Sequence, residues 1–197
     1  MIKGTEIRKA DRAIDNLFLD RWSPRAMSGE SIPHEDLMSL FEAARWAPSS
    51  FNEQPWRILY ARRESEDWPL FFDLLTEGNK AWARNAAALL LFLSNTIMMS
   101  SGKPSRTHSF DTGAAWENLA LQGTLKGYVV HGMQGFDYDR AREVLDIPES
   151  FQVEAMIAVG KPGPKEALPE RLQQRESPNA RKPVEEFVRE GSFRFSS

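Results

Sequence analysis

Apolar residues recur at three- and four-residue steps in two early stretches of the chain, which is the spacing of one buried helix face. The first stretch predicts an opening helix whose apolar face consists of Ile7, Ala10, Ile14, Leu17 and Phe18. We expect this helix to end before Pro24, because proline disrupts a helix interior. The second stretch predicts a helix after residues 31–36, and its buried face consists of Leu37, Leu40, Phe41 and Ala44.

Two apolar runs in the first half of the chain predict β-strands. Residues 56–63 are rich in strand-forming types, and residues 86–94 are apolar enough to be covered on both faces. Between them, residues 66–85 have a helical pattern with a break near Gly78 and Asn79. A strand, a helix and a second strand are therefore expected in this order.

Residues 110–126 are apolar around most of the helix circumference, which predicts a helix buried on several sides. Strands are predicted at 128–134 and 151–160, with a short helix at 137–146 between them. Because strands and helices mix without strict alternation, the pattern predicts an α+β fold with helices packed on a sheet.

The composition changes after this point, since five of the 12 prolines fall within residues 161–183. Such a segment is predicted to be an extended arm on the surface rather than a packed element. We therefore expect one domain formed by residues 1–160, with residues 161–197 as a C-terminal arm of the same domain.

Composition and charge exclude several classes of protein. The net charge is only −3, so no positive field favours nucleic acid as a partner. The chain has no cysteine, which excludes disulfides, thiolate nucleophiles and iron–sulfur ligation. The longest apolar run, residues 86–93, is too short to cross a membrane. With no apolar signal core near the start, the cytoplasm is the expected location.

No self-sufficient catalytic motif is present. The three histidines, His34, His108 and His131, do not have the spacing of metal ligands. The sequence contains no G-x-S-x-G elbow, no G-x-G-x-x-G fingerprint and no Walker loop. We therefore expect no catalytic acid, base or nucleophile and no metal site, and a bound cofactor would have to carry any difficult chemistry.

Two polar blocks have the composition of a cofactor site. The block RWSPR places Arg21, Ser23 and Arg25 within five residues, a set that suits a phosphate group. The block PSSFNEQPW at residues 48–56 offers neutral hydrogen-bonding groups between two prolines. It suits recognition of a polyol and a heterocycle, and it suits equally well a helix-ending turn that bonds its own backbone.

Together with GNKAWARNAAALLLF, FDTGAAWENLALQGTLKGY, GMQGFD and an arginine before PVEEFV, these blocks resemble the FMN-dependent nitroreductase family. The match runs in order over nearly the whole chain. The resemblance implies an α+β homodimer with a mostly antiparallel central sheet flanked by helices and a helical dimer interface. It also implies two FMN sites, each built from both chains.

The resemblance assigns three groups of site residues. The FMN phosphate and ribityl chain would be held by Arg21, Trp22, Ser23, Arg25 and Arg181. The flavin would be approached from the partner subunit by Ser49, Ser50, Asn52 and Gln54. Asn79 would point toward the flavin ring, and the turn at Gln134 and Gly135 would face its N5 edge.

The sequence departs from the family pattern at three positions. The usual arginine-arginine-serine is Arg21-Trp22-Ser23, which removes one cation from the phosphate site. Ala87 stands near a position where many relatives have proline, and Asn179 stands where a second basic residue would precede Arg181.

The resemblance implies an NAD(P)H-dependent oxidoreductase with a ping-pong hydride-transfer cycle. Its electron-poor acceptor would be a nitroaromatic, a quinone or an activated alkene. One alternative is a flavin-storage or flavin-modifying protein without nicotinamide turnover, and another is an interaction module without cofactor. Dimerisation would bury the apolar helix at 110–126, although a thick monomer could also cover it.

Overall fold

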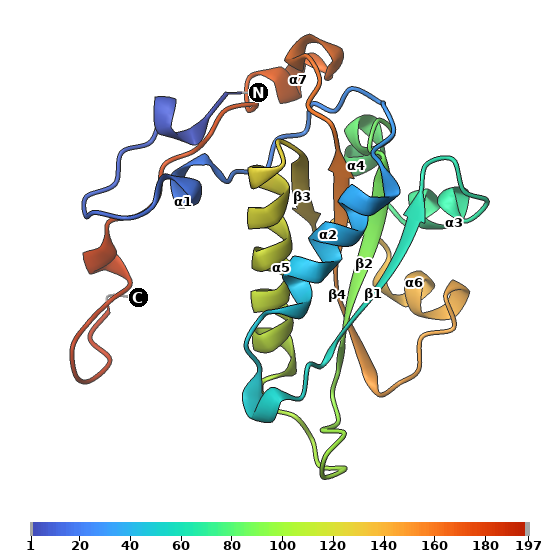
Figure 1. Cartoon of the computed structure of the whole chain (residues 1–197), viewed down its shortest axis with the longest axis vertical. Helices are drawn as coiled ribbons and strands as arrows, with labels where there is room; N and C mark the ends of the chain where they lie inside the picture. The colour runs from blue at the N-terminus through green and yellow to red at the C-terminus, as the bar shows by residue number, and fades with distance from the viewer. Residues whose placement is uncertain (1, 196–197) are drawn as a thin grey trace.

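The computed structural model describes residues 2–195 and is built around a four-stranded antiparallel sheet with helices on both faces (Figure 1). The strands are β1 (Trp56–Arg62), β2 (Ala88–Asn95), β3 (Val129–Met133) and β4 (Phe151–Gly160). Their order in the sheet is β1-β2-β4-β3, so β3 is an edge strand. The predicted α+β class is confirmed, and every strand pair in the sheet is antiparallel.

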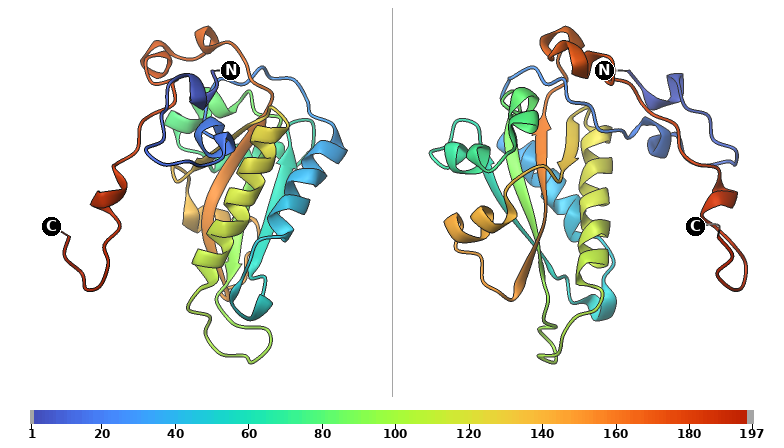
Figure 2. Two further views of the ribbon diagram at one scale, coloured as in Figure 1. Left: turned by 60° about the vertical axis from the view of Figure 1, so that its left-hand side comes forward. Right: turned by 180° about the vertical axis from the view of Figure 1, so that it is seen from behind.

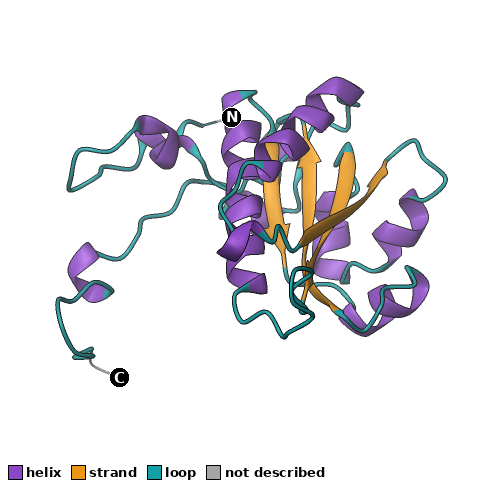
Figure 3. Cartoon of the chain, turned by 60° about the horizontal axis from the view of Figure 1, so that its bottom comes forward, coloured by secondary structure: helices purple, strands orange, loops and turns teal. Residues whose placement is uncertain are grey.

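Two layers of helices enclose the sheet (Figure 3). One face is covered by α2 (His34–Arg45) and α5 (His108–Leu125). The other face is covered by α3 (Trp68–Asp73), α4 (Glu77–Ala83) and α6 (Tyr138–Val144). The shorter elements are η1 (Gly4–Glu6), α1 (Asn16–Asp20), η2 (Ser50–Asn52), η3 (Lys165–Ala167), α7 (Glu170–Gln173) and η4 (Val184–Glu186).

Strand β2 explains why a continuous apolar run is needed at the centre of this fold. All eight of its residues are buried. Leu89 and Leu91 pack in the cluster under α3, α4 and α6, whereas Leu90 and Phe92 pack in the cluster under α2 and α5. Because successive side chains of a strand point to opposite faces, a strand covered on both sides has no polar face.

The predicted opening helix is wrong. The chain forms only η1 and the short α1 in this region, and Ile7, Ile14 and Phe18 are exposed. A short helix obtains most of its stability from packing of its apolar face. Segment 2–20 instead projects away from the sheet (Figure 2), and Ile7 and Ile14 line a pocket with Val184 of the C-terminal segment rather than packing in either core cluster.

The predicted break inside residues 66–85 is misplaced. Gly78 and Asn79 lie within α4, and the break occupies residues 74–76 between α3 and α4. Its position is set by a contact distant in sequence, because the amide of Thr76 donates to the carbonyl of Gly135 at 3.0 Å. A contact between residues so far apart cannot be predicted from the local pattern of apolar residues.

The prediction that residues 161–183 lack packed structure is also wrong. This segment contains η3 and α7, which follow directly on Pro164 and Pro169. Leu168 and Leu172 are buried in the core cluster. The prolines therefore start short helical turns here, in keeping with their preference for helix starts.

The two ends of the chain run beside each other away from the sheet (Figures 1 and 2). The Nε atom of Arg8 donates to the carbonyl of Asn179 at 2.8 Å, and Arg12 pairs with Glu185 at 3.8 Å. Several large apolar side chains of these segments are exposed, namely Ile7, Ile14, Phe18, Val184, Phe187, Val188 and Phe193. Within residues 2–195, no helix combines the length and the apolar character needed to cross a membrane.

Candidate cofactor site

A pocket of about 550 Å³ gathers five guanidinium groups from three segments that are distant in sequence. They belong to Arg8, Arg21, Arg25, Arg175 and Arg181. Trp22 and Ser23 line the same pocket. The structure thus brings together all five residues that the sequence assigned to the phosphate end, and it adds Arg8 and Arg175.

The pocket is electrostatically suited to an anion. Burial, followed by the charges of Arg181 and Arg21, lowers the pKa of Arg8. Burial also lowers the pKa of Arg25, partly opposed by the carboxylate of Glu176. A bound anion would offset both the desolvation of these groups and their mutual repulsion.

Arg8 is a pocket residue that the sequence pattern did not reveal. Its Nη1 atom donates to the carbonyls of Leu19 and Arg21, each at 2.9 Å, and its Nε atom binds the C-terminal segment. Its Nη2 atom is buried and has no partner among the described residues. A buried cationic donor without an acceptor is costly, so this atom fits a phosphate oxygen in the pocket.

Trp22 occupies the position where the family pattern has a second arginine. Its side chain is buried, and its indole nitrogen donates to the carbonyl of Ile2 at 3.0 Å. The indole therefore holds the N-terminal segment in place, while Arg8 from that same segment contributes a cation to the pocket. This arrangement compensates for the cation that is missing at position 22.

Edge strand β3 connects the arginine pocket to the predicted flavin-ring residues. His131 lines the pocket, and its ring lies 4.6 Å from that of Trp82. The indole nitrogen of Trp82 donates to Asn79 Oδ1 at 3.2 Å, and Asn79 Nδ2 donates to the carbonyl of Gly135 at 2.9 Å. Gln134 directly follows the strand, about 10 Å along the chain from His131.

The turn at Gly135 has no room for a side chain. A Cβ atom there would lie 2.7 Å from Asn79 Nδ2 and 3.0 Å from Thr76 Oγ1. Asn79 uses both polar atoms of its amide within the chain. It therefore fixes the turn whose backbone amides are the candidates for the flavin edge, while its own contact with the ring stays a prediction.

Buried His131 is neutral at physiological pH. Burial lowers its pKa to about 4, and the charge of Arg25 acts in the same direction. Its Nδ1 atom lies 2.8 Å from the carbonyl of Pro24, so a proton on Nδ1 ties strand β3 to the segment that carries the arginines. A neutral imidazole adds no charge to the pocket.

The low pKa of His131 makes stability depend on pH. Between pH 6.5 and pH 4 the unfolded chain binds a proton that the folded chain excludes, so the free energy of unfolding should decrease as the pH falls. The expected slope is about 1.4 kcal/mol per pH unit. Urea denaturation at several pH values measures it, and His131→Gln should flatten the slope, unlike the control His34→Gln at an exposed position. An equal slope in all three proteins would contradict this assignment.

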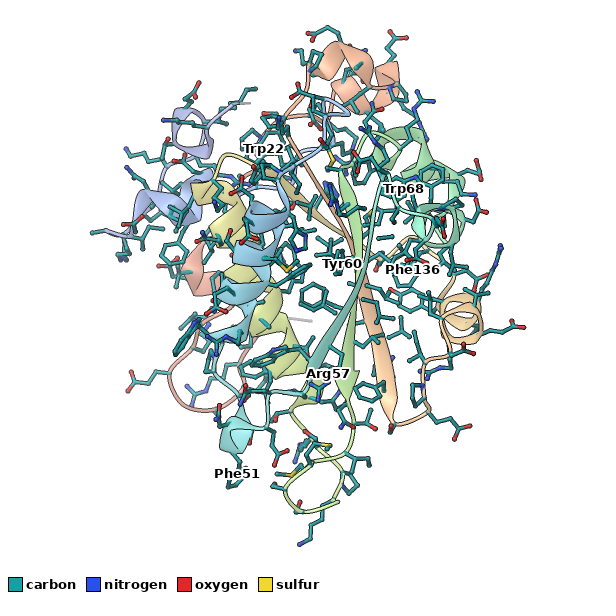
Figure 4. All side chains as sticks on the ribbon, turned by 45° about the vertical axis from the view of Figure 1, so that its right-hand side comes forward. Trp22, Phe51, Arg57, Tyr60, Trp68 and Phe136 are labelled. Carbon is teal, nitrogen blue, oxygen red and sulfur yellow. The ribbon has the colours of Figure 1, made fainter. Side chains whose placement is uncertain are left out.

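The four polar residues of the PSSFNEQPW block lie far from the arginine pocket. Figure 4 shows Trp22 and Phe51 at opposite ends of the molecule. Ser49, Ser50, Asn52 and Gln54 are therefore not joined to the pocket within one chain. The structure brings together two of the three predicted groups of site residues.

The loop itself is held in a strained conformation. Phe51, Asn52 and Gln54 have positive φ angles of 53°, 57° and 48°, which are uncommon for non-glycine residues and costly for a bulky one such as Phe51. The amide of Gln54 donates to Ser49 Oγ at 3.0 Å, and its side-chain amide donates to the carbonyl of Asn52 at 3.0 Å. The loop therefore contains the internal hydrogen bonds expected of a turn that bonds its own backbone.

Helix α5 anchors this loop. The buried carboxylate of Asp111 accepts from the amide of Ser50 at 3.0 Å and from the hydroxyl of Thr107 at 3.1 Å. Phe51 at the tip of the loop is 86% exposed. The loop thus presents an aromatic ring and neutral polar groups outward from a rigid base.

Comparison with known proteins assigns the chain to a family. The model of the nitroreductase family matches residues 19–77 and 63–161. The chain belongs to the nitroreductase family. The family resemblance inferred from the sequence is thereby confirmed.

A solved structure, described as an oxidoreductase containing FMN, is 50% identical to this chain. The structural match covers 96% of this chain and 97% of that protein, with a TM-score of 0.92. A second relative is MhqN of Bacillus subtilis, which is named as an NAD(P)H nitroreductase. It is 26% identical to this chain, and the match covers 82% of this chain and 90% of MhqN. A third relative, from Archaeoglobus fulgidus, is named as an NADH dehydrogenase/NAD(P)H nitroreductase. It is 29% identical to this chain, and the match covers 74% of this chain and 83% of the relative.

Proposed function

We propose that this nitroreductase-family protein is an FMN-dependent oxidoreductase that uses NAD(P)H to reduce an electron-poor acceptor. The observation that carries the proposal is the arginine pocket with the unpartnered, buried Nη2 atom of Arg8. The FMN-containing structure that is 50% identical to this chain supports the same cofactor.

Within one chain, the phosphate end of FMN would be held by Arg8, Arg21, Ser23, Arg25 and Arg181. Guanidinium groups suit this role because they bind phosphate oxygens through charge-assisted hydrogen bonds. Trp22 would form a wall of the pocket and keep Arg8 in place. The backbone amides of Gln134 and Gly135 would approach the ring.

We propose that a second copy of the chain completes each site. Figure 4 shows Phe51 at the opposite end of the molecule from Trp22 of the arginine pocket. The polar residues that flank Phe51 in sequence are Ser49, Ser50, Asn52 and Gln54, so another copy would have to bring them to the ring. The exposed apolar side chains of segments 2–20 and 180–195 also favour a homodimer.

Bound FMN supplies hydride transfer between reduced nicotinamide and an acceptor such as a nitroaromatic, a quinone or an activated alkene. The chain contributes binding, orientation and electrostatics. Its sequence contains no G-x-G-x-x-G fingerprint for a separate dinucleotide site, which supports a ping-pong order in which nicotinamide and acceptor use one site in turn.

Anaerobic titration of the purified protein tests this function. We expect the protein to be yellow, NADH or NADPH to bleach its flavin absorbance, and p-benzoquinone to restore it. A yellow protein that neither nucleotide bleaches would instead be a flavin-storage or flavin-modifying protein. A colourless protein whose melting temperature does not respond to FMN would contradict both functions.

A further inference from the structure

A second pocket, of about 420 Å³, shares the lining residue Trp22 with the arginine pocket. Its apolar walls are Trp22, Pro24, Pro162 and Pro164. The pocket is formed where the first residues of the chain, the segment after α1 and the segment after β4 meet. None of the five guanidinium groups lines it.

Glu176 supplies a buried, half-satisfied carboxylate to this second pocket. Only 6% of the residue is exposed, and it lines the pocket. Its Oε1 atom accepts from the amides of Arg25 and Ala26 at 2.7 Å and 2.8 Å. Its Oε2 atom is buried and has no partner among the described residues. A buried carboxylate oxygen without a hydrogen-bond partner is costly, so a ligand that brings a hydrogen-bond donor to it should be bound favourably.

The other charges around the pocket favour a cation. Three carboxylates, those of Glu6, Glu166 and Glu176, line it together with one cation, Lys165. The guanidinium of Arg25, which interacts with Glu176, lines the arginine pocket instead. No group of three or more metal-ligating side chains occurs among residues 2–195. The proline and indole walls suit an organic body better than a hydrated metal ion.

We propose that this pocket binds a small organic molecule with a primary ammonium group and an apolar body. The ammonium N–H donates to Glu176 Oε2, and the apolar body packs against Trp22 and the prolines. A quaternary ammonium has the charge but no N–H, and an alcohol has the donor but no charge. Both should therefore bind more weakly than the primary ammonium.

Four benzyl compounds test this site in calorimetric titrations of the full-length protein as purified. Benzylamine is expected to bind with saturation at millimolar concentrations. Benzyl alcohol and benzyltrimethylammonium should bind roughly 10- to 100-fold more weakly, which is the range for loss of a hydrogen bond to a charged group. Benzoate, with the opposite charge, should not bind.

Two variants locate the interaction. Glu176→Gln keeps an oxygen for the amides of Arg25 and Ala26 but removes the charge, so benzylamine should bind roughly 10- to 100-fold more weakly. The control Glu166→Gln removes the same charge at an exposed edge position and should change binding by only a few fold. Melting temperatures of both variants show whether they fold.

Three results would overturn the proposal. The first is that benzylamine shows no saturable binding at millimolar concentrations. The second is that benzylamine and benzyl alcohol bind with equal affinity. The third is that benzylamine binds folded Glu176→Gln and the parent protein with equal affinity. If Glu176→Gln does not fold, the order of the four probes on the parent protein decides alone. Because the titrations follow a ligand other than flavin, their outcome is independent of the proposed oxidoreductase activity.

Discussion

The Arg8→Ala protein is expected to bind FMN roughly 10- to 100-fold more weakly than the parent, because a hydrogen bond to a charged group contributes about 1.5 to 3 kcal/mol. The buried Nη2 atom of Arg8 has no partner among the described residues, so its acceptor should be the phosphate. Riboflavin, which lacks the phosphate, should lose much less affinity. Fluorescence titration of the apoprotein with both flavins measures the difference.

Two further variants calibrate this result. Arg181→Ala should show the same selective loss of FMN affinity, because its guanidinium lines the same pocket. Arg12→Ala is the control, since its side chain is 77% exposed and pairs only loosely with Glu185. Equal loss for FMN and riboflavin in Arg8→Ala would mean that Arg8 acts only by holding the carbonyls of Leu19 and Arg21.

The Gly4→Ala protein is expected to lose FMN affinity to a similar extent although Gly4 lines neither pocket. A Cβ atom at this position would lie 1.6 Å from the backbone carbonyl oxygen of Leu19. A backbone clash cannot be relieved by rotating a side chain, so η1 must move away from the segment that ends α1. Arg8, whose amide donates to the carbonyl of Gly4 at 2.7 Å, should be displaced from the pocket.

The melting temperature and FMN affinity of Gly4→Ala should change unequally. Segment 2–20 lies outside both core clusters, so the main unfolding transition should shift little while FMN affinity falls. Gly78→Ala is a matched control, because a Cβ atom there meets nothing within 4 Å. Unchanged FMN affinity in Gly4→Ala would show that the N-terminal segment does not position Arg8.

The elements that sequence reasoning located correctly are those with strong local signals. Strand β4 spans the predicted residues 151–160, and β2 reads as apolar because it is covered on both faces. Of the predicted apolar face of α2, Leu37, Leu40 and Ala44 are buried, and Phe41 is partly buried against the same cluster. In each case a buried face is continuous along the chain, so its period is visible in the sequence.

The elements that were missed depend on contacts between distant segments. The break before α4 is set by Gly135, 59 residues away from Thr76. The apolar stripe at 7–18 has the period of a helix, but segment 2–20 has no core beneath it. Pattern reasoning assumes that an apolar face packs in the core of its own chain, and Ile7, Ile14 and Phe18 belong to neither core cluster.

The candidate site shows the same division. The RWSPR block was visible because its polar residues are adjacent in sequence, and Arg181 was identified through the family resemblance. Arg8 could not be identified, since it is one of several basic residues in a polar segment, next to Lys9. It reaches the pocket only because its guanidinium bridges three carbonyls. The buried carboxylate of Glu176 was missed for a similar reason, because its partners are 150 and 151 residues away.

A crystal structure grown with FMN tests the central claim most directly. We predict a dimer in which the phosphate lies within hydrogen-bonding distance of Arg8 Nη2 and of the Arg181 guanidinium, with the ring between the Gln134–Gly135 turn of one copy and the residues 49–54 of the other. A phosphate bound elsewhere, or a pocket filled by the chain's own side chains in the presence of excess FMN, would contradict the account.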